Sequence, residues 1–497
     1  MRQHSTRRYW LLAAAVLLAA ANAGARGDLA RRKLDNGLTV ILQRDDSSAV
    51  ACVAAFVAAG ESRTGVTGVG VRPLLQEIIG ASGEQAMRQD EFAPLLEMRD
   101  ADQLPPDLAS ILQGENPEER PHAGRVFVSG TDWEFAHVHS TVVAELLPLA
   151  CRLLAQAVFQ PDITEEARET ALARLRMRAG MLRANPMQRI IERTYALFQE
   201  ALTGSRLGAV PPVDQYAQAP DSSLEEVRGF HSRYFVPNNM CVVVASPLPH
   251  DEALRAVAEA FSAAESRPVP EAPAPPQPRA EPGAKVDSMT LLRLMGGAAS
   301  LMVGAAAPSL ASPDIYAAQV ANAALGRPGG RLKRDRGLAR ALLSPDVTDE
   351  EAPVESLLLE AGTTSSRLVV HAFANPLRLE SVRGIITDWF ASLANSPLKE
   401  DELAQAKAYA INTYVRLHES RRDQAWLLGR YEILGVGAEF DETFVERVQA
   451  VTSDDVQRLA RDSLQVTAVG VAMPETPAER TERPEEAQRQ GMAPIRT

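Results

Sequence analysis

The chain has 497 residues, with 52 Lys and Arg against 64 Asp and Glu, and 45% of its residues are hydrophobic. These values are ordinary for a globular protein and exclude fibrous, low-complexity and disulfide-scaffold classes. The formal net charge is -12 and no long basic block occurs. Nucleic-acid binding is therefore excluded as a main function, because phosphate binding needs clustered Lys and Arg.

The first 23 residues have the order of a secretory signal peptide. A basic start is followed by an apolar run over 10–20 and by a small-x-small cleavage pattern at 21–23. The run is slightly short for a bilayer span, so we expect cleavage and export to a periplasm or to the extracellular space. An uncleaved N-terminal anchor is the alternative. No later stretch is long and apolar enough to cross a membrane, so no membrane association is expected after cleavage.

The sequence then divides into two long halves joined by a proline-rich linker at 266–286. Proline removes backbone donors and the other linker residues offer little to bury, which predicts an extended spacer. A charged stretch rich in Pro and Gln at 474–497 is typical of a disordered tail. The expected domains cover 29–265 and 287–473.

The first half alternates strand-like and helix-like segments after the turn signal Asn36-Gly37. Ser223 and Glu226 have the spacing of a capping box, which predicts a helix that begins at 224. Strands are expected over 38–42, 51–59, 133–143 and 240–245, and helices over 71–79, 144–158, 165–182 and 224–234.

The second half repeats this order of elements. Its last helix is expected to begin after Ser453, the predicted N-cap, and a strand follows as it does at the end of the first half. An internal duplication of about 200 residues is the simplest explanation. Strand-like sequence occurs over 291–307, 367–373 and 466–472, and helices are expected over 313–325, 377–394 and 399–431.

Three cysteines, Cys52, Cys151 and Cys241, lie in apolar segments far apart in the sequence. Their odd number and their surroundings predict buried free thiols and not a disulfide framework.

Several blocks of the sequence resemble the insulinase/pitrilysin family of zinc metallopeptidases, which includes the mitochondrial processing peptidase. The blocks occur in the family's order and cover nearly all of the chain after the signal peptide. They are LDNGLTVIL at 34–42, FVAAGESRTGVTGVG at 56–70, EEVRGFHSRYFVPNN at 225–239, ALGRPGGRLKRDRGLAR at 324–340 and ESRRDQAWLLGRYEILGVG at 419–437. The resemblance implies an α+β fold of two homologous metallopeptidase-like domains, of the LuxS or processing-peptidase kind, that form a half clamshell. Its chamber would bind an extended peptide along a sheet edge.

Active members of that family bind zinc through a helical His-x-x-Glu-His motif and a Glu from a later helix. The two imidazoles hold the metal, and the carboxylate between them takes a proton from the metal-bound water. In this sequence the matching positions are Pro73 for the first His, Gln76 for the catalytic Glu and Glu77 for the second His. Proline has no lone pair to donate and a carboxamide is no base. We therefore predict no metal ligand, no zinc cofactor and no catalytic residue here.

The position of the third ligand falls on Arg178. A guanidinium repels a divalent cation, so this residue argues against zinc. Glu165, Glu166 and Glu169 are candidates for the third ligand if the alignment has slipped. Glu77 would then be the only ligand on the facing helix, so a site of three ligands could not form. The opposite charges at matched positions instead predict an ion pair between Glu77 and Arg178, which would link the two helices in place of the metal.

In active relatives an Arg and a Tyr seven residues apart in the second half hold the substrate carbonyl. The matching positions are Lys333 and Arg340, which are the predicted substrate-binding residues. Lys333 keeps a positive charge, whereas Arg340 changes the shape and charge of that wall. In two-subunit members the non-catalytic partner usually supplies this pair, so the change weakens that role as well.

An alternative metal site is conceivable on the predicted strand at 133–143. His137 and His139 lie on the same strand face, with Asp132 and Glu134 close by. Such His-x-His pairs are more commonly polar surface. The Gly-rich segment 324–331 lacks the Gly-Lys-Ser/Thr ending of a phosphate loop, so a loop that lines the chamber is expected.

These observations predict an exported insulinase-like protein that lacks the zinc site and acts as a non-catalytic peptide-binding or regulatory partner. Its partners would be a peptide or unfolded polypeptide and an active family subunit in a heterodimer, and not nucleic acid. Two alternatives stay open, an active zinc metalloendopeptidase with an unrecognised site and a stand-alone peptide binder or scaffold.

Overall fold

The computed structural model describes residues 28–63, 68–89, 127–205, 210, 212–274, 276–279, 283–289, 297–343, 352–363, 366–466 and 468–475. The expected signal peptide at 1–23 and residues 476–497 of the expected tail lie outside these ranges. Among the helices of the described ranges, none has the length and apolar character that a bilayer crossing requires.

The first half is built on a six-stranded sheet with the strand order β1-β2-β6-β3-β5-β4. β2 and β6 are parallel, and all other neighbours are antiparallel. The strands are β1 Leu29–Lys33, β2 Thr39–Arg44, β3 Val50–Val57, β4 Val128–Thr131, β5 Ala136–Val143 and β6 Met240–Ser246.

The second half is built on a five-stranded sheet with the order β7-β11-β8-β10-β9. β7 and β11 are parallel, as β2 and β6 are, and the other pairs are antiparallel. This order repeats that of the first sheet from β2 to β4, which is β2-β6-β3-β5-β4. In both sheets the first strand of the set in chain order lies beside the last strand of the set, and the second, fourth and third strands follow. This match supports the predicted duplication. The strands are β7 Gly283–Met289, β8 Ala299–Ala306, β9 Ser356–Glu360, β10 Arg367–Ala374 and β11 Ala468–Pro474.

Helices surround both sheets. In the first half they are α2 Val71–Gln89, α5 Leu147–Phe159, α6 Glu165–Ala184, α7 Pro186–Thr203, α8 Pro212–Gln218, α9 Leu224–Tyr234 and α10 His250–Phe261. In the second half they are α12 Ile315–Gly326, α13 Arg336–Leu342, α14 Leu379–Asn395, α15 Glu400–Arg416, α16 Arg421–Ile433, α17 Phe440–Ala450 and α18 Ser453–Asp462. Short 3-10 helices cover Glu61–Arg63, Ala144–Leu146, Ala219–Asp221, Pro237–Asn239 and Pro376–Arg378.

The α+β fold class predicted from the sequence is confirmed. Most predicted elements lie within a few residues of observed ones, but α2 continues ten residues beyond its predicted end at 79, and the stretch predicted as helical over 399–431 is divided into α15 and α16. The capping box is present, since Glu226 N donates to Ser223 Oγ at 3.2 Å. The N-cap prediction for the last helix was wrong by one residue. Thr452 is the cap, because its hydroxyl accepts from Asp455 N at 3.1 Å while the Asp455 carboxylate accepts from Thr452 N at 2.8 Å.

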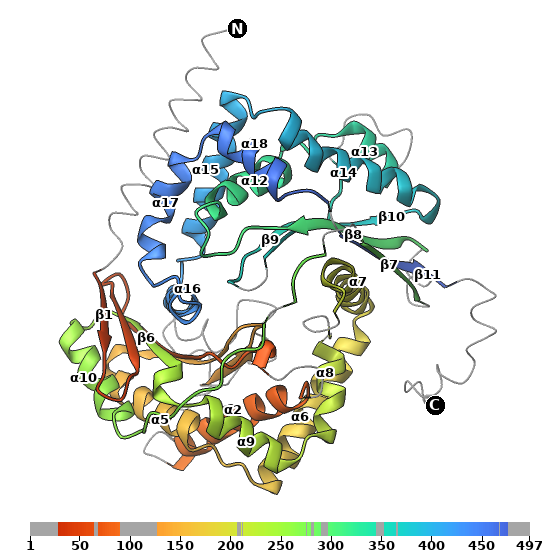
Figure 1. The fold of residues 1–497 in the computed structure, drawn as a ribbon. Coiled ribbons are helices and arrows are strands. Elements are labelled where there is room, and N and C mark those ends of the chain that lie inside the picture. The colour runs from red at the N-terminus through yellow and green to blue at the C-terminus, as the bar shows by residue number, and fades with distance from the viewer. Residues whose placement is uncertain are drawn as a thin grey trace, which may run out of the picture.

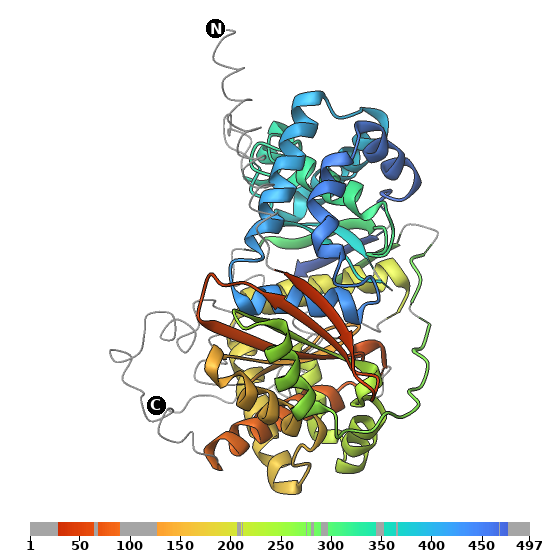
Figure 2. The ribbon, with the colours of Figure 1, turned by 90° about the vertical axis from the view of Figure 1, so that its left-hand side faces the viewer.

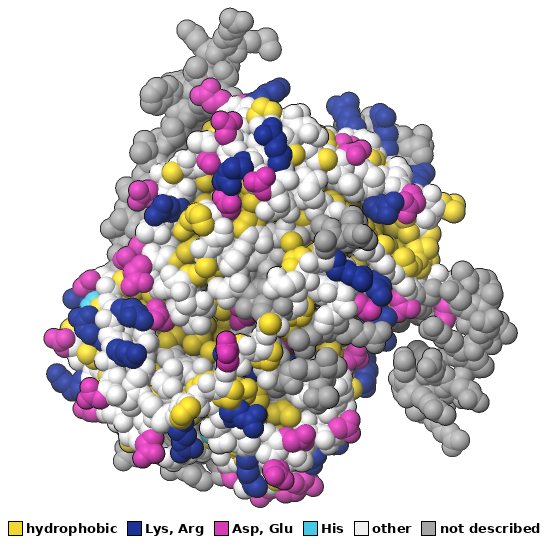
Figure 3. All heavy atoms as spheres, in the orientation of Figure 1, with side chains coloured by type: hydrophobic (Ala, Val, Ile, Leu, Met, Phe, Trp, Pro, Cys, Tyr) yellow, Lys and Arg dark blue, Asp and Glu magenta, His cyan; other side chains and the backbone are white. Residues whose placement is uncertain are grey.

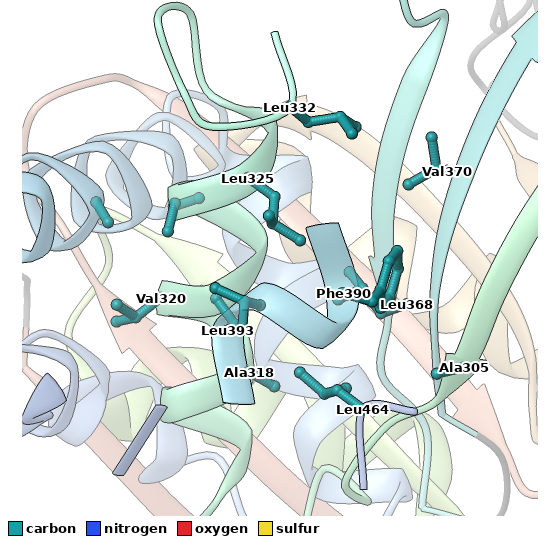
Figure 4. Close-up of a cluster of buried hydrophobic side chains, with 14 of the residues drawn as sticks. Ala305, Ala318, Val320, Leu325, Leu332, Leu368, Val370, Phe390, Leu393 and Leu464 are labelled. Carbon is teal, nitrogen blue, oxygen red and sulfur yellow. The ribbon is translucent and has the colours of Figure 1, made fainter. Parts of the chain in front are cut away.

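The elements stack in layers (Figure 1). α12, α14, α15 and α18 cover the outer side of the second sheet, and α2, α5, α9 and α10 cover the outer side of the first. The core under the second outer layer joins Phe390 and Leu393 of α14 to Leu368 and Val370 of β10 (Figure 4). The halves thus have separate outer cores, as expected for homologous domains.

The middle layer consists of two helices that the halves exchange. α7 belongs to the first half but packs on β7, β8 and β11, and α16 belongs to the second half but packs on β3 and β6. In Figures 1 and 2 both helices lie between the two sheets. The buried residues of this layer include Phe198, Ala201 and Leu202 of α7, and Ala425 and Leu428 of α16. Each half therefore buries apolar side chains of one of its helices against the sheet of the other half, and this burial stabilises their association.

The linker is shorter and more tightly held than predicted. β7 already begins at Gly283, so the last four residues of the predicted linker are strand. Backbone oxygens of the linker accept hydrogen bonds from the first half, with Arg63 Nη1 donating to Pro270 at 2.7 Å and Asn238 Nδ2 to Arg267 at 2.9 Å. Figure 2 shows this segment running along one side of the molecule. These bonds explain how a proline-rich segment follows one path.

The predicted state of the cysteines is confirmed: Cys52, Cys151 and Cys241 are buried free thiols. Burial raises the pKa of the Cys52 and Cys151 thiols to about 12, so these groups stay protonated at neutral pH.

Candidate functional site: an ion pair at the predicted metal position

Helix α2 carries the first three positions of the degenerate motif. Pro73 lies in its first turn, where a missing N–H costs nothing because the amide has no partner within the helix. Leu74, Leu75 and Ile78 are buried in the outer core of the first half. The same short segment also buries two polar side chains, Gln76 and Glu77.

Glu77 and Arg178 form the ion pair predicted from the sequence, with Arg178 Nη1 in contact with Glu77 Oε1. The side chain of Glu77 is 2% exposed and that of Arg178 is 16% exposed. The two residues come from α2 and α6, which pack side by side. Because a buried carboxylate is costly without a partner, the guanidinium is what allows Glu77 to occupy this position.

Further polar residues lie around this pair, and no sequence pattern predicted them. Tyr216 of α8 is partly buried, and this burial raises the pKa of its phenol. The charge of Arg178 opposes the shift, and that of Glu77 adds to it. Glu192 of α7 also has a raised pKa, mainly through burial, and its Oε1 accepts from Gln188 Nε2 at 3.0 Å. The site is thus a polar junction of α2, α6, α7 and α8.

Gln76 is the residue that the sequence predicts at the position of the catalytic carboxylate. Its side chain is buried, and no residue in the described ranges donates a hydrogen bond to its Oε1. Its main-chain oxygen accepts from Ser129 Oγ of β4 at 3.0 Å, so this turn of α2 lies beside the edge strand of the first sheet. A carboxamide can donate and accept hydrogen bonds there but cannot take a proton from water.

A second charged pair lies one turn earlier on α2. Arg72 is buried, which lowers the pKa of its guanidinium, and its Nη1 lies 3.5 Å from Glu61 Oε1. The same carboxylate oxygen accepts from Gln215 Nε2 of α8 at 2.8 Å. This contact also joins α2 to α8 and adds no base free to activate water.

The residues of this junction do not fit a zinc ion. Zinc needs neutral imidazole, thiolate or carboxylate donors, whereas Pro73 offers none and Arg178 brings a positive charge to the carboxylate of Glu77. Within the described residues, no three His, Cys, Asp or Glu side chains lie together in a way that could hold a metal ion.

Lys333 and Arg340 lie elsewhere. Lys333 Nζ donates to the carbonyl of Val354 at 2.6 Å, which anchors the loop before β9 within the second half. Arg340 is exposed on α13, at the outer layer of the second sheet, and its carbonyl accepts from Arg378 Nη1 at 2.9 Å. The structure therefore does not bring these two residues to the junction of Glu77 and Arg178.

The alternative metal site on β5 does not form either. The rings of His137 and His139 stack with centroids 5.9 Å apart, and His137 also stacks on Phe56 at 6.0 Å. Burial lowers the pKa of His137 to about 4. The carboxylate of Glu134 turns to the second half and accepts from Thr363 N at 3.0 Å. These side chains pack between the halves and do not converge on a common point.

Comparison with known proteins agrees with this description of the fold. Residues 221–410 match the family model described as the peptidase M16 inactive domain. The chain is 25% identical over 278 residues to an uncharacterised zinc protease of Mycobacterium leprae, an alignment that covers 54% of this chain and 58% of that protein. Less than two thirds of that relative's length is therefore matched.

Two solved structures show the same fold along most of the chain. A protease from Helicobacter pylori superimposes with a TM-score of 0.68 at 15% identity, covering 90% of this chain and 100% of that one. A structure described as a peptidase M16 inactive domain from Pseudomonas fluorescens gives a TM-score of 0.67 at 16% identity, with 90% and 98% covered. At these identities the similarity defines the fold and leaves the chemistry to the residues of the site.

Proposed function

Because this chain belongs to the insulinase (M16) family of peptidases, we propose that it is an exported, non-catalytic member that binds peptides as the partner of an active family peptidase. It would bind an extended or unfolded polypeptide and present it to, or withhold it from, the active subunit. Export rests on the signal-peptide pattern at 1–23.

The observation that carries the proposal is the ion pair between Glu77 and Arg178. The fold is retained along the chain, but the two helices that would share a metal are joined by a carboxylate and a guanidinium. With Gln76 at the place of the general base, the site lacks both a Lewis acid and a proton acceptor. Binding is the part of the family's function that such a site could keep.

Peptide binding is supported by the sheet edges. β4 ends the first sheet and β9 ends the second, and the edge of a sheet can pair with an added strand. Leu358 of β9 is half exposed. On the face shown in Figure 3, hydrophobic side chains collect across the band between the halves while charged ones lie mostly around it. An extended segment with apolar side chains matches such a surface.

The test is a metal and cleavage assay on the purified protein. We expect less than about 0.1 zinc per chain by elemental analysis, because the sequence offers no set of three ligands. No cleavage of casein or of a fluorogenic peptide library is expected, with or without added zinc. Stoichiometric zinc together with chelator-sensitive cleavage would overturn the proposal and favour the active metalloendopeptidase.

A matched variant separates true activity at this site from activity elsewhere. Gln76→Ala should leave a contaminating or remote activity unchanged, whereas it should reduce any activity that this junction supports. Binding is measured separately by fluorescence anisotropy of labelled extended peptides, and the partner by co-purification with an active family member. Saturable peptide binding without any family partner would favour the stand-alone binder.

A further inference from the structure

Helix α6 has two apolar faces, and one of them has no partner in the described structure. Leu172, Leu175 and Ala179 are buried on the side that joins the core of the first half. On the opposite side Met177 is 58% exposed and Met181 is 52% exposed. An amphipathic surface helix normally presents a polar face to solvent, so this second face needs an explanation.

The exposed face is a continuous strip. At 100° per residue, Ala173, Met181 and Ala184 lie within about 40° of Met177, and together they span about 17 Å of the helix. Gly180 borders the strip, and a Cβ built on it would meet nothing within 4 Å. Methionine side chains adapt their shape to a partner, which makes such a strip a suitable contact surface.

Charges of opposite sign lie at the two ends of the same helix. The first turns carry Glu165, Glu166 and Glu169, the last turn carries Arg183, and Arg176 lies near the middle of the helix. Glu169 and Arg183 are exposed and lie on the same flank of the strip, within about 40° of each other around the helix. The face is therefore acidic at one end and basic at the other, with an apolar middle that Arg176 flanks.

We propose that this face pairs in antiparallel orientation with the same face of a second copy of the chain. A two-fold axis near residue 175 sets Ala173 of one copy against Met177 of the other. Glu169 lies six residues before the axis and Arg183 eight residues after it, so at 1.5 Å per residue they lie about 9 and 12 Å from it. Each Glu169 therefore comes beside Arg183 of the other copy, and the contact is made twice, as two-fold symmetry requires.

The charges favour a second copy over a uniformly acidic or basic partner. Either of those would leave one end of the face against a like charge. The two Arg176 side chains approach each other at the axis, and their repulsion weakens the pairing. One helix pair also buries less than the roughly 800 Å² per partner of a standard interface, so the dimer should be weak, with a dissociation constant on the order of micromolar.

Sedimentation velocity of the full chain over roughly 1 to 100 µM tests the dimer, a range that brackets this constant. Met177→Asp should raise the dissociation constant at least tenfold, because it buries a charge in the strip. Leu377→Asp is the matched control, since Leu377 is 95% exposed at a different place, and it should change nothing. A monomer at every concentration, or a dimer that survives Met177→Asp, would overturn the proposal.

Charge reversal tests the orientation. Glu169→Arg and Arg183→Glu should each weaken the dimer, and the double variant should recover it because the opposed pair is restored in reversed form. Arg176→Ala should tighten it. Failure of the double variant to recover would rule out the antiparallel arrangement.

A cross-link identifies the occupant of the face. Met177→Cys places two thiols about 6 Å apart along the paired helices, so a short bismaleimide should join two copies, while the native cysteines are buried. Leu377→Cys should give no cross-linked dimer. Protection of the Met177→Cys thiol in a chain that is monomeric at every concentration would mean that another part of the chain covers the strip, and would overturn the proposal.

Discussion

Replacing Gly429 by alanine should weaken the packing of α16 against the first sheet. A Cβ built on Gly429 lies 2.0 Å from Cε2 and 2.3 Å from Cδ2 of Phe56. Carbon atoms in contact stay about 3.5–4.0 Å apart, so ring or helix must move by about 1.5–2 Å. Phe56 is fully buried and its ring lies 5.8 Å from that of Phe135, which leaves little room for the ring to yield.

The expected cost follows from two opposing effects. Overpacking a tight core costs about 3 kcal/mol when neighbours cannot relax, whereas alanine in place of glycine stabilises a helix by about 1 kcal/mol. The net loss should be about 2 kcal/mol. Gly384→Ala in α14 is the matched control, because its added Cβ would meet nothing within 4 Å, and it should gain about 0.5–1 kcal/mol.

Urea unfolding followed by circular dichroism and tryptophan fluorescence measures both variants. Trp426 of α16 packs 6.3 Å from the ring of Phe135, so its emission reports on the same contact. The two unfolding free energies should differ by about 3 kcal/mol. If Gly429→Ala unfolds at the same urea concentration as the control, the close approach of α16 to the first sheet is not what joins the halves.

Three further predictions concern the site and the stability of each half. Arg178→Met should destabilise the chain by about 3–5 kcal/mol, because Glu77 is left buried without its cation. Adding Glu77→Leu to Arg178→Met should recover most of this loss, because no buried charge is then left without a partner. A double variant as unstable as Arg178→Met alone would contradict this. Burial lowers the pKa of His371 to about 4, against 6.5 in the unfolded chain. Between these pH values the unfolded chain binds more protons than the folded chain, so the free energy of unfolding falls as the pH is lowered, by up to about 3 kcal/mol. Urea midpoints from pH 7 to pH 4.5 should therefore fall less steeply in His371→Leu than in the wild type. Ser223→Ala should cost about 1 kcal/mol, because the hydroxyl caps α9, and thermal denaturation measures it; an unchanged melting temperature would exclude that role.

The match between predicted and observed elements has a local cause. Strands such as β3 and β6 are nearly continuous apolar runs, and the capping box at Ser223 requires only neighbouring residues. α7 was not predicted, although it is amphipathic. Its apolar face meets a sheet made of residues from 283 onward, and periodicity shows that a face is buried but not against what.

For the site, residue types alone supported the prediction that the metal ligands and the base are missing, since proline, glutamine and arginine at 73, 76 and 178 offer neither a zinc donor nor a proton acceptor. Opposite charges at 77 and 178 even predicted their contact. The folded chain was needed to show which distant groups lie around that pair, namely Tyr216, Glu192 and the edge strand β4. It was also needed to show that Lys333 and Arg340 lie apart from the pair. Each side chain's chemical groups are given by its residue type. The burial of a side chain and the charges around it depend instead on how the helices pack, including α7 and α16, which the halves exchange between the sheets.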